Sequence, residues 1–262
     1  MRFSKWHALG NSYLLVERAE FGAPLASWAA ERLCDPHTGV GSDGVLEVVS
    51  VDGAECEVVI WNPDGSTAEL SGNGTRITAA WLLERAAGDE IIVRVGDRRV
   101  GARRAGAEIV TDVGPVEVGP AETIDVEGEA VEVTPVRVGN PHAVVVREPT
   151  GEALRRLGPL LERHRRFPER TNVQLVRFEG SGAATALVWE RGAGETPTSG
   201  TSAVAVAAAG IAAHRLRSPV VVTMPGGDVV VEFDGEWNAR LRGPAEKICD
   251  GDLAPSLLID AR

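Results

Sequence analysis

The chain has 262 residues, 44% hydrophobic and 25% charged, an ordinary balance for a soluble globular protein of one large or two medium domains. Its net charge of −11 disfavours nucleic acid and anionic membranes as partners. It lacks a long apolar leader, contains no apolar run long enough to span a bilayer, and has three scattered cysteines without a C-x-x-C pair. We therefore expect a cytoplasmic protein with no membrane segment, disulfide framework or zinc site.

In chain order, the first half is predicted to alternate short strands with few helices. Strands are expected at 3–7, 13–16, 45–50 and 56–61, and helices at 24–33 and 76–85. Strands at 90–95, 98–103 and 108–112 then resemble a β-meander, with turns at Gly96-Asp97 and Ala105-Gly106. Residues 113–130 are rich in Gly, Pro and Glu, and we place the boundary between two domains there.

The second half is predicted to begin again with strands and to contain one wholly apolar helix. Its strands are expected at 131–138, 143–146, 171–178, 183–189, 220–224, 229–233 and 237–241, with helices at 151–164 and 202–214 and a final strand after 247. Helix 202–214 is almost entirely Ala, Val, Gly and Ile, so it must be buried on all sides. We expect strands to form a cup around it, and helix 76–85 to take that role in the first half.

Trp61–Leu83 is the stretch that points to a binding site. A polar loop broken by Gly and Pro leads through Ser71-Gly72-Asn73-Gly74-Thr75 into the apolar helix. A serine and a glycine-rich turn at a helix start leave free backbone N–H groups, which together with the helix dipole favour an anion. A single turn of this kind would be weak support for a site.

The same pattern returns in the second half of the chain. Trp189 and Ser199 follow Trp61 and Ser71 by 128 residues each, and Gly139-Asn140 follows Gly10-Asn11 by 129. We interpret these matches as an internal duplication in which each half presents one helix N-terminus. The alternative is a pair of unrelated helix starts in a globular enzyme.

Two such helix ends, facing each other, could hold one small carboxylate. Ser71 and Ser199 would then lie on opposite sides of its α-carbon. This arrangement suits a two-base proton exchange, in which one group removes the α-proton and the other delivers a proton to the opposite face. The helix dipoles would stabilise the negative charge that develops as the proton leaves.

Several motifs resemble those of the diaminopimelate epimerase family, in order and over nearly the whole chain. They are Lys5–Asn11, Gly39–Gly44, Asn62–Ser66, Ser71–Arg76, Gly139–His142, Pro168–Gln174, Trp189–Thr196 and Gly243–Lys247. The resemblance implies an α/β (α+β) fold of two pseudo-symmetric domains, each a curved sheet wrapped around a central helix. The expected domains are residues 1–116 together with 247–262, and residues 117–246, with the active site in the cleft between them.

The resemblance also implies an activity and a set of site residues. The family's enzymes interconvert LL- and meso-diaminopimelate with two cysteines as base and acid, and they need no pyridoxal phosphate and no metal. The expected partner is a small amino dicarboxylate, and the sequence leaves a homodimer open. By motif, the distal end of the substrate would be held by Asn11, Asn62, Asn140, Asn172 and Arg191, and the reacting carboxylate by Gly72, Asn73, Gly200 and Thr201. Glu190 would contact the reacting amino group. His142 would lie beside the first catalytic position, and Glu190 near the second.

The chain departs from the family at both catalytic positions, which are Ser71 and Ser199 instead of cysteine. An alcohol is a far weaker acid than a thiol, so each serine needs a neighbour to take its proton, and His142 and Glu190 are the motif-placed candidates. Three alternatives follow. The chain is a serine variant that still racemises or epimerises diaminopimelate or a close amino acid; it isomerises or eliminates on another small acid; or it only binds, as a degenerate paralogue or a chain with both cysteines replaced.

Overall fold

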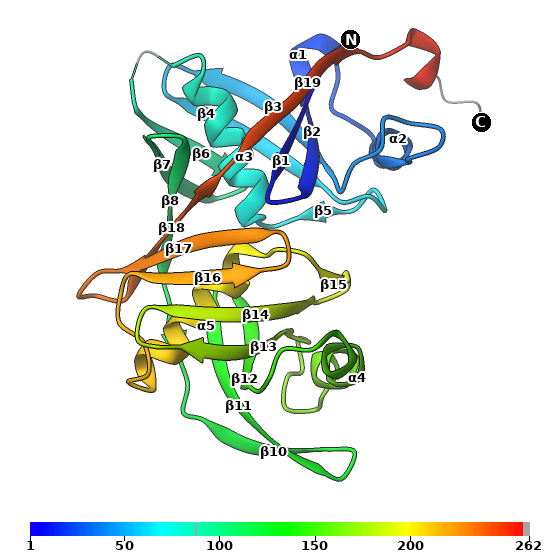
Figure 1. Ribbon diagram of the computed structural model, residues 1–262. Helices are drawn as coiled ribbons and strands as arrows, with labels where there is room; N and C mark the ends of the chain where they lie inside the picture. The colour runs from blue at the N-terminus through cyan, green and yellow to red at the C-terminus, as the bar shows by residue number, and fades with distance from the viewer. Residues whose placement is uncertain (87, 259–262) are drawn as a thin grey trace. The chain divides into compact units, whose positions relative to one another are not determined.

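The computed structural model describes residues 1–86 and 88–258 and has a mixed α/β architecture with many strands and few helices (Figure 1). The chain divides into two compact units: unit 1 contains residues 1–111 and the chain from Pro244 onward, and unit 2 contains residues 112–243. The sequence places these boundaries after residues 116 and 246. None of the described helices is long and apolar enough to cross a membrane.

Unit 1 contains most of the elements predicted for the first half, with shifted ends. Its strands are β1 (Arg2–Ala8), β2 (Asn11–Glu17), β3 (Val45–Asp52), β4 (Glu55–Trp61), β5 (Thr67–Ala68), β6 (Glu90–Val95), β7 (Arg98–Ala105), β8 (Glu108–Pro115, which continues into unit 2) and β19 (Glu246–Asp252). Its helices are α1 (Arg18–Phe21), α2 (Ser27–Cys34), α3 (Gly72–Leu83) and the short 3-10 helix Pro255–Leu258.

Unit 2 follows the same scheme. Its strands are β9 (Glu117–Val118), β10 (Glu122–Val126), β11 (Glu129–Val138), β12 (Asn140–Val146), β13 (Asn172–Glu179), β14 (Ala183–Glu190), β15 (Gly194–Thr196), β16 (Val220–Met224), β17 (Gly227–Phe233) and β18 (Asn238–Pro244), and its helices are α4 (Gly151–Glu162) and α5 (Gly200–Ala212).

The pairing of the strands confirms the internal duplication. In unit 1, β2 is parallel to β3 and β4 is parallel to β6, whereas the pairs β1–β2, β3–β4, β4–β5, β6–β7 and β7–β8 are antiparallel. In unit 2, β12 is parallel to β13 and β14 is parallel to β16, again among antiparallel neighbours. Each parallel pair is connected by a crossover that contains a helix. In unit 1 the crossover helices are α2, between β2 and β3, and α3, between β4 and β6; in unit 2 they are α4, between β12 and β13, and α5, between β14 and β16.

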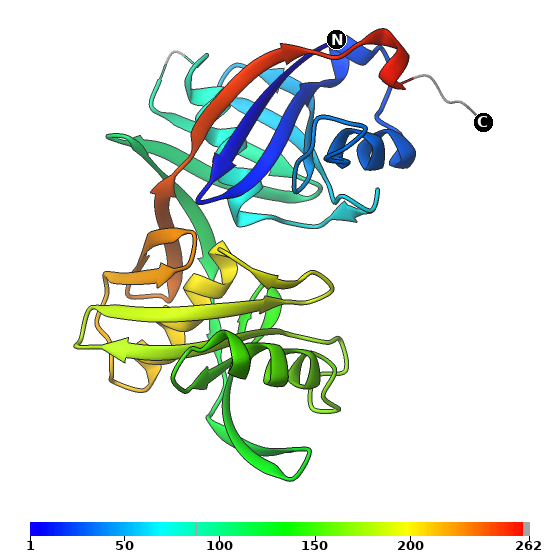
Figure 2. The same cartoon turned by 45° about the vertical axis from the view of Figure 1, so that its right-hand side comes forward.

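In each unit the sheet curves around the second of these helices (Figures 1 and 2). Helix α3 contacts β1, β2, β4, β6 and β7, and every residue from Asn73 to Leu83 is buried. Helix α5 contacts β9, β11, β12, β13, β14, β16 and β17, and Ser202–Gly210 is buried throughout. The prediction that the apolar helix lies inside a cup of strands is therefore confirmed, because a helix with no polar face has no side that water can cover favourably.

The strands of both sheets alternate their side chains between two helices. On β13, Val173 and Leu175 pack in the cluster that contains α4, whereas Gln174 hydrogen-bonds Ser202 on α5. On β2, Leu14 and Val16 pack in the cluster that contains α2, whereas Tyr13 and Leu15 pack with α3. Both polar residues that matter for the site, Tyr13 and Gln174, thus lie on the face of the sheet that carries α3 or α5.

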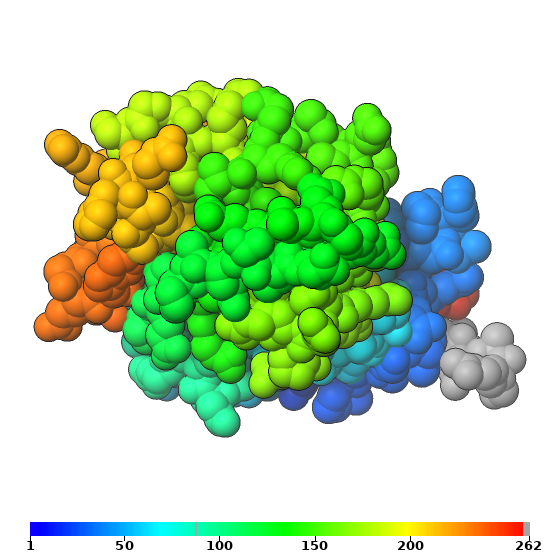
Figure 3. All heavy atoms as spheres, turned by 90° about the horizontal axis from the view of Figure 1, so that it is seen from below, coloured from blue at the N-terminus to red at the C-terminus, as the bar shows by residue number. Residues whose placement is uncertain are grey.

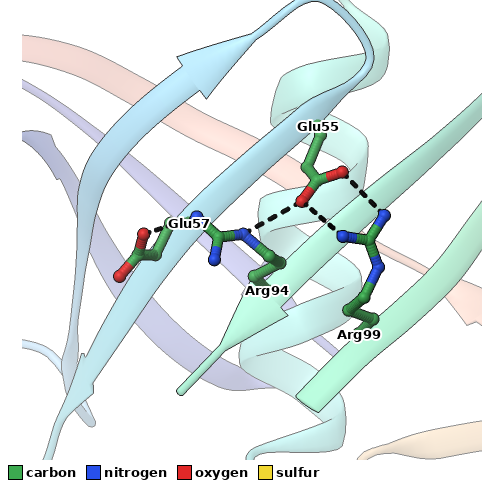
Figure 4. Close-up of polar contacts among 4 residues, drawn as sticks. All are labelled: Glu55, Glu57, Arg94 and Arg99. Atoms are coloured by element: carbon green, nitrogen blue, oxygen red, sulfur yellow. Dashed lines mark hydrogen bonds and ion pairs between the residues drawn. The ribbon is translucent and has the colours of Figure 1, made fainter. Parts of the chain in front are cut away.

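The outward face of β4, β6 and β7 carries a cluster of ion pairs (Figure 4). Arg94 contacts the carboxylates of Glu55 and Glu57, and Arg99 makes two hydrogen bonds to Glu55. The alternating residues Cys56, Val58 and Ile60 point the other way, into the core beside α3. Partly exposed pairs of this kind contribute little to stability, so the core on the other face holds this sheet together.

Residues 113–130, where the sequence analysis places the domain boundary, include strands β9 and β10 and the end of β8. Strand β10 pairs antiparallel with β11, and Ile124 and Val126 turn inward to the core beside α4. The frequent Gly, Pro and Glu residues hide this alternation in the sequence. The β10–β11 hairpin extends from the body of unit 2 in Figures 1 and 2, and its green atoms occupy the centre of the face shown in Figure 3.

Candidate active site

Helix α3 begins where the sequence pattern places a helix start, although four residues earlier than predicted. Ser71 is its N-cap, with extended backbone angles of φ −134° and ψ 118°. The Ser71 side chain accepts a hydrogen bond from the Gly74 backbone N–H at 3.0 Å. This cap offsets the low helix propensity of Gly72, Asn73 and Gly74, which is why the helix includes them.

Beside this cap lies an aromatic hydroxyl that the sequence analysis did not single out. The hydroxyl of Tyr13 on β2 lies 3.0 Å from Ser71 Oγ. Residues 13 and 71 are far apart in the chain, so no motif spacing links them. The available signals were that Tyr13 is the only tyrosine in the chain and shares a strand face with Asn11, two positions before it.

Asn11 and Asn73, both predicted to contact substrate, lie together at the same end of α3. Asn73 Nδ2 approaches Asn11 Oδ1 at 3.4 Å, and Asn73 Oδ1 accepts a hydrogen bond from Arg76 at 2.9 Å. Arg76 is fully buried and also donates to the Pro244 carbonyl oxygen at 3.0 Å. Burial lowers the pKa of Arg76 to about 10, with Glu108 acting against the shift, so Arg76 remains a cation at neutral pH and fixes the Asn73 amide. We call Tyr13, Ser71, Asn73 and Asn11 the first half-site.

Asn62 is held within its own turn. Its side-chain Nδ2 donates to Ser66 Oγ at 2.9 Å, and its backbone N–H donates to the Ser66 carbonyl oxygen at 2.8 Å. The turn is stabilised further by Asp64, which accepts from the Ser66 hydroxyl and backbone N–H. The structure therefore gives Asn62 a fixed position, and its role at the distal end of a substrate stays a prediction.

In unit 2, Ser199 occupies the matching N-cap position of α5, with φ −146° and ψ 121°. Its side chain makes no capping hydrogen bond and is buried. Instead the Ser199 hydroxyl donates to the Glu190 carboxylate, which also accepts from Thr196 Oγ1 at 2.8 Å. Burial raises the pKa of Glu190, although these two donors act in the opposite direction. A carboxylate with a raised pKa next to a hydroxyl is a typical general base.

His142 lies on β12 and is joined to the first turn of α5 through other side chains. Its Nε2 lies 2.8 Å from Asn140 Oδ1, and its Nδ1 lies 3.0 Å from Gln174 Nε2. Gln174 Nε2 also donates to Ser202 Oγ at 2.9 Å. In this arrangement the imidazole Nε2–H donates a hydrogen bond to Asn140 Oδ1, and Nδ1 accepts a hydrogen bond from the Gln174 amide.

Burial lowers the pKa of His142 to about 3, and the positive charge of Arg191 lowers it further, against the hydrogen bond from Gln174. The imidazole is therefore neutral at working pH, and both of its nitrogens are engaged. The role of His142 as proton acceptor beside the first catalytic position stays a prediction. It would require Gln174 to release Nδ1.

Asn172 and Arg191 lie together, although the Asn172 side chain contacts backbone groups. Asn172 Nδ2 donates to the Pro141 carbonyl oxygen at 3.0 Å, and Asn172 Oδ1 accepts from the Arg191 backbone N–H at 2.9 Å. The Arg191 guanidinium is exposed and donates to the Glu169 carbonyl oxygen at 3.1 Å. Asn172 thus positions the backbone directly after Glu190, the last residue of β14. We call Ser199, Glu190, Thr196, His142 and Asn140 the second half-site.

The loop that leads to each capping serine follows a tryptophan that is tied to a buried carboxylate. Trp61 Nε1 donates to Glu47 at 3.0 Å, and Glu47 is also paired with Arg18. Trp189 Nε1 donates to Glu162 at 2.8 Å, and Glu162 also accepts from Arg170 and, at 3.1 Å, from the Gly192 backbone N–H.

The second of these ties needs a glycine in α4. A side chain at Gly158 would place its Cβ 2.7 Å from the Trp189 ring, so only glycine allows the ring to pack on the helix. The tie positions the loop that follows Trp189, including Glu190. Glu47, Glu162 and their arginines were not among the predicted site residues.

The described part of the chain contains no group of three or more His, Cys, Asp and Glu side chains that could hold a metal ion. What the half-sites share is a serine hydroxyl at the N-terminus of a buried helix, where backbone N–H groups and the helix dipole favour a carboxylate. Both also place an acid or base next to the serine. Such a site can bind an anionic group and move a proton near it.

Solved structures with this fold include proteins described as epimerases and racemases. The chain resembles a predicted epimerase from Pseudomonas aeruginosa, with a TM-score of 0.72 and 18% identity over 96% of this chain and 98% of that one. It also resembles a hydroxyproline epimerase from Agrobacterium vitis with bound trans-4-hydroxy-L-proline, with a TM-score of 0.71 and 15% identity over 96% of this chain and 91% of that one. The fold is thus one used by epimerases and racemases.

Sequence comparison narrows this class to one family. The model of diaminopimelate epimerase matches residues 3–119 and 134–248. A diaminopimelate epimerase from Desulforudis audaxviator is 37% identical over 96% of this chain and 98% of its own length, and one from Moorella thermoacetica is 35% identical over 97% and 99%. The chain belongs to the diaminopimelate epimerase family. It is an isomerase of the epimerase and racemase type.

Proposed function

We propose that this chain interconverts LL- and meso-diaminopimelate by two-base exchange of the α-proton, with Ser71 and Ser199 at the positions where its family carries cysteines. The observation that carries the proposal is the Ser199–Glu190 pair at the N-terminus of α5. An alcohol cannot act as a base by itself, and here a carboxylate with a raised pKa is in position to take the serine proton. The family relationship supplies the choice of substrate.

In the proposed mechanism, both half-sites bind one substrate jointly. The backbone N–H groups at Gly72-Asn73 and Gly200-Thr201 hold the reacting carboxylate, where the two helix dipoles stabilise charge that moves onto it. On one face, Ser199 Oγ takes the α-proton while Glu190 takes the Ser199 hydroxyl proton. The electron pair of the broken C–H bond moves onto the carboxylate group, and Ser71 delivers a proton to the opposite face.

The remaining predicted residues would recognise the distal end of the substrate. We assign this role to the amide and guanidinium groups that the two half-sites and their loops present: Asn11, Asn62, Asn140, Asn172 and Arg191. A small amino dicarboxylate has an amino group and a carboxylate at that end, which match amide oxygens and an arginine respectively. A place in lysine biosynthesis follows from this substrate, and a cytoplasmic location and a homodimer stay predictions.

The direct test is NMR of LL- and meso-diaminopimelate incubated separately in D2O with the purified chain. Deuterium that enters the α-position together with stereochemical inversion supports the proposal. Exchange that occurs only with a different amino or hydroxy acid would show that the site serves another α-proton reaction. Saturable binding without exchange over long incubation would identify a protein that only binds.

A crystal structure with bound substrate tests the two-base geometry. We expect Ser71 Oγ and Ser199 Oγ on opposite sides of the α-carbon, each within roughly 3–3.5 Å, because direct proton transfer needs such contact. Both serines on one side of the α-carbon would exclude two-base exchange, even if the chain binds diaminopimelate.

A further inference from the structure

The position of Tyr13 in the first half-site is tightly fixed. Its ring is only 7% exposed and lies in the core around α3. A Cβ atom at Gly44 would lie 2.5 Å from Tyr13 Cε1, so the glycine leaves the space that the ring occupies. The Tyr13 hydroxyl is thus held 3.0 Å from Ser71 Oγ by packing on both sides of the ring.

The hydrogen bonds of Ser71 indicate which way a proton would move. A serine oxygen has one proton and two lone pairs. One lone pair of Ser71 Oγ receives the Gly74 backbone N–H. If the Tyr13 hydroxyl donates to the second lone pair, the Ser71 proton is left for a third group. In that state Ser71 is arranged as a proton donor with a proton source behind it.

Ser199 has the opposite arrangement. It donates its proton to Glu190, and its side chain accepts no capping N–H. Its oxygen is therefore arranged to accept a proton while it passes its own proton to the carboxylate. The two serines occupy the same N-cap position in a repeated fold, and their neighbours assign them different roles.

Resting on the proposed function, we infer that Tyr13 is a positioning residue that supplies a proton through Ser71. A phenol in a peptide has a pKa of about 10, and an alcohol is a much weaker acid. A Ser71 alkoxide left after protonating the substrate would therefore take the Tyr13 proton. No motif assigns such a role to residue 13.

The proton transfers balance as follows in one direction. Glu190 gains the Ser199 hydroxyl proton as Ser199 Oγ gains the α-proton, and the C–H electron pair moves onto the substrate. That pair then forms the new C–H bond with the Ser71 proton, and Ser71 Oγ takes the Tyr13 proton. Glu190 ends protonated and Tyr13 ends as a phenolate. The reverse reaction begins from that state, and proton exchange with water restores the first state.

The test uses Tyr13→Phe, which keeps the ring and removes the hydroxyl. LL- and meso-diaminopimelate are incubated separately in D2O, and α-deuterium uptake and inversion are followed by NMR. We expect inversion to fall about 100-fold or more, the lower range for loss of an acid–base group. The isomer whose α-proton faces Ser199 should still exchange with solvent, because Ser199 and Glu190 remain. Its ratio of exchange to inversion should therefore rise strongly.

Thr78→Val is the matched control. It removes a buried hydroxyl on α3, the helix against which Tyr13 packs, and that hydroxyl donates to the Gly74 carbonyl oxygen at 2.9 Å. A general weakening of α3 would lower exchange and inversion together, and so this control should leave their ratio unchanged.

A second pair of variants covers the case in which Tyr13→Phe disturbs folding. A thiol is acidic enough to work without a phenol behind it. In the Ser71→Cys background, Tyr13→Phe should therefore change inversion less than about threefold, since the transfer it assists is no longer limiting. An equal loss in both backgrounds would show that Tyr13 only packs against the core.

The outcomes for the two hypotheses can be distinguished. If the unaltered chain exchanges and inverts diaminopimelate but Tyr13→Phe has an unchanged exchange-to-inversion ratio, the role of Tyr13 is excluded and the proposed function stands. If the unaltered chain exchanges neither isomer, the proposed function fails and the role of Tyr13 fails with it.

Discussion

The two half-sites have the same backbone frame and different chemistry. In both, a serine with extended backbone angles caps a buried helix that the sheet surrounds. Ser71 accepts a capping N–H and lies beside a phenol, whereas Ser199 makes no side-chain cap and lies beside a carboxylate. The comparison teaches that a duplicated fold preserves where the capping serine lies, whereas a few neighbouring side chains decide which hydrogen bonds that serine makes.

The largest effect should come from removing the carboxylate of the second half-site. Glu190→Gln keeps the size of the side chain but cannot accept the Ser199 proton, so we expect α-proton exchange by that half-site to fall about 10²–10⁴-fold. The isomer whose α-proton faces Ser199 should lose the most exchange, whereas Tyr13→Phe should leave the exchange of that isomer in place. Deuterium uptake by each isomer in D2O measures this.

Glu195→Gln is the control for that variant. Glu195 lies on β15 next to Thr196, is exposed, and pairs with Arg155 at 3.2 Å. This change should leave the exchange rates within a factor of two. If Glu190→Gln lowered the exchange of both isomers equally, the two half-sites would not differ in the way proposed.

The next effect removes the difference between the half-sites. Ser71→Cys with Ser199→Cys places two thiols at the two helix N-termini. A thiol has a pKa of about 8.5 before any local shift. We expect more than a tenfold rise in α-proton exchange, since each unit of pKa mismatch is worth about 1.4 kcal/mol. Either single substitution should help less, because inversion needs both faces. A double variant that folds and binds diaminopimelate without exchanging it would indicate that the site has diverged beyond these positions.

A smaller effect concerns the carboxylates that tie the tryptophans. Burial alone would raise the pKa of Glu162, but donation from Trp189, Gly192 and Arg170 outweighs it and lowers the pKa. Because its pKa is lowered in the folded state, ionised Glu162 stabilises the fold at pH values above its ordinary pKa of 4.5. This stabilisation is lost as the pH falls through the folded-state pKa.

We therefore expect Glu162→Gln to lower the free energy of unfolding by about 1–3 kcal/mol at pH 7 and by less at pH 3.5. Urea unfolding at both pH values provides the measurement, and Glu148→Gln, at an exposed ion pair of the same unit, serves as the control. An equal loss at the two pH values would show that the carboxylate charge contributes nothing.

The smallest effect separates the two caps. Ser71→Ala removes the hydrogen bond to the Gly74 N–H and should cost about 1 kcal/mol of folding stability. Ser199→Ala removes no capping bond, and its cost comes instead from the lost hydrogen bond to the Glu190 carboxylate. Glu190→Gln should therefore reduce the cost of Ser199→Ala and leave the cost of Ser71→Ala unchanged. Urea melts of these variants test this difference, and a Ser71→Ala variant as stable as the unaltered chain would mean that the cap has no stabilising effect.

The sequence predicted the frame that carries the candidate site because its signals are local. The helix starts at Ser71 and Ser199, the loops that follow Trp61 and Trp189, and the burial of the apolar helix α5 all follow from neighbouring residues and their periodicity. The ends of the elements were less accurate. Helix α3 begins at Gly72, where the Ser71 cap offsets the poor helix propensity of glycine, and α5 begins at Gly200, which is buried.

The sequence by itself determined the repeat, the family and the two serine positions. Glu190 lies only nine positions before Ser199, and its motif already places it there. Only the tertiary structure decided what surrounds Ser71, His142 and Trp189, because those contacts join residues that no local pattern relates. Hydrogen bonds join Tyr13 to Ser71 across 58 positions, Gln174 to His142 across 32, and Glu162 to Trp189 across 27. Such pairs form when strands and helices pack on a common core. Proton transfer depends on those distances, and spacing along the chain cannot supply them.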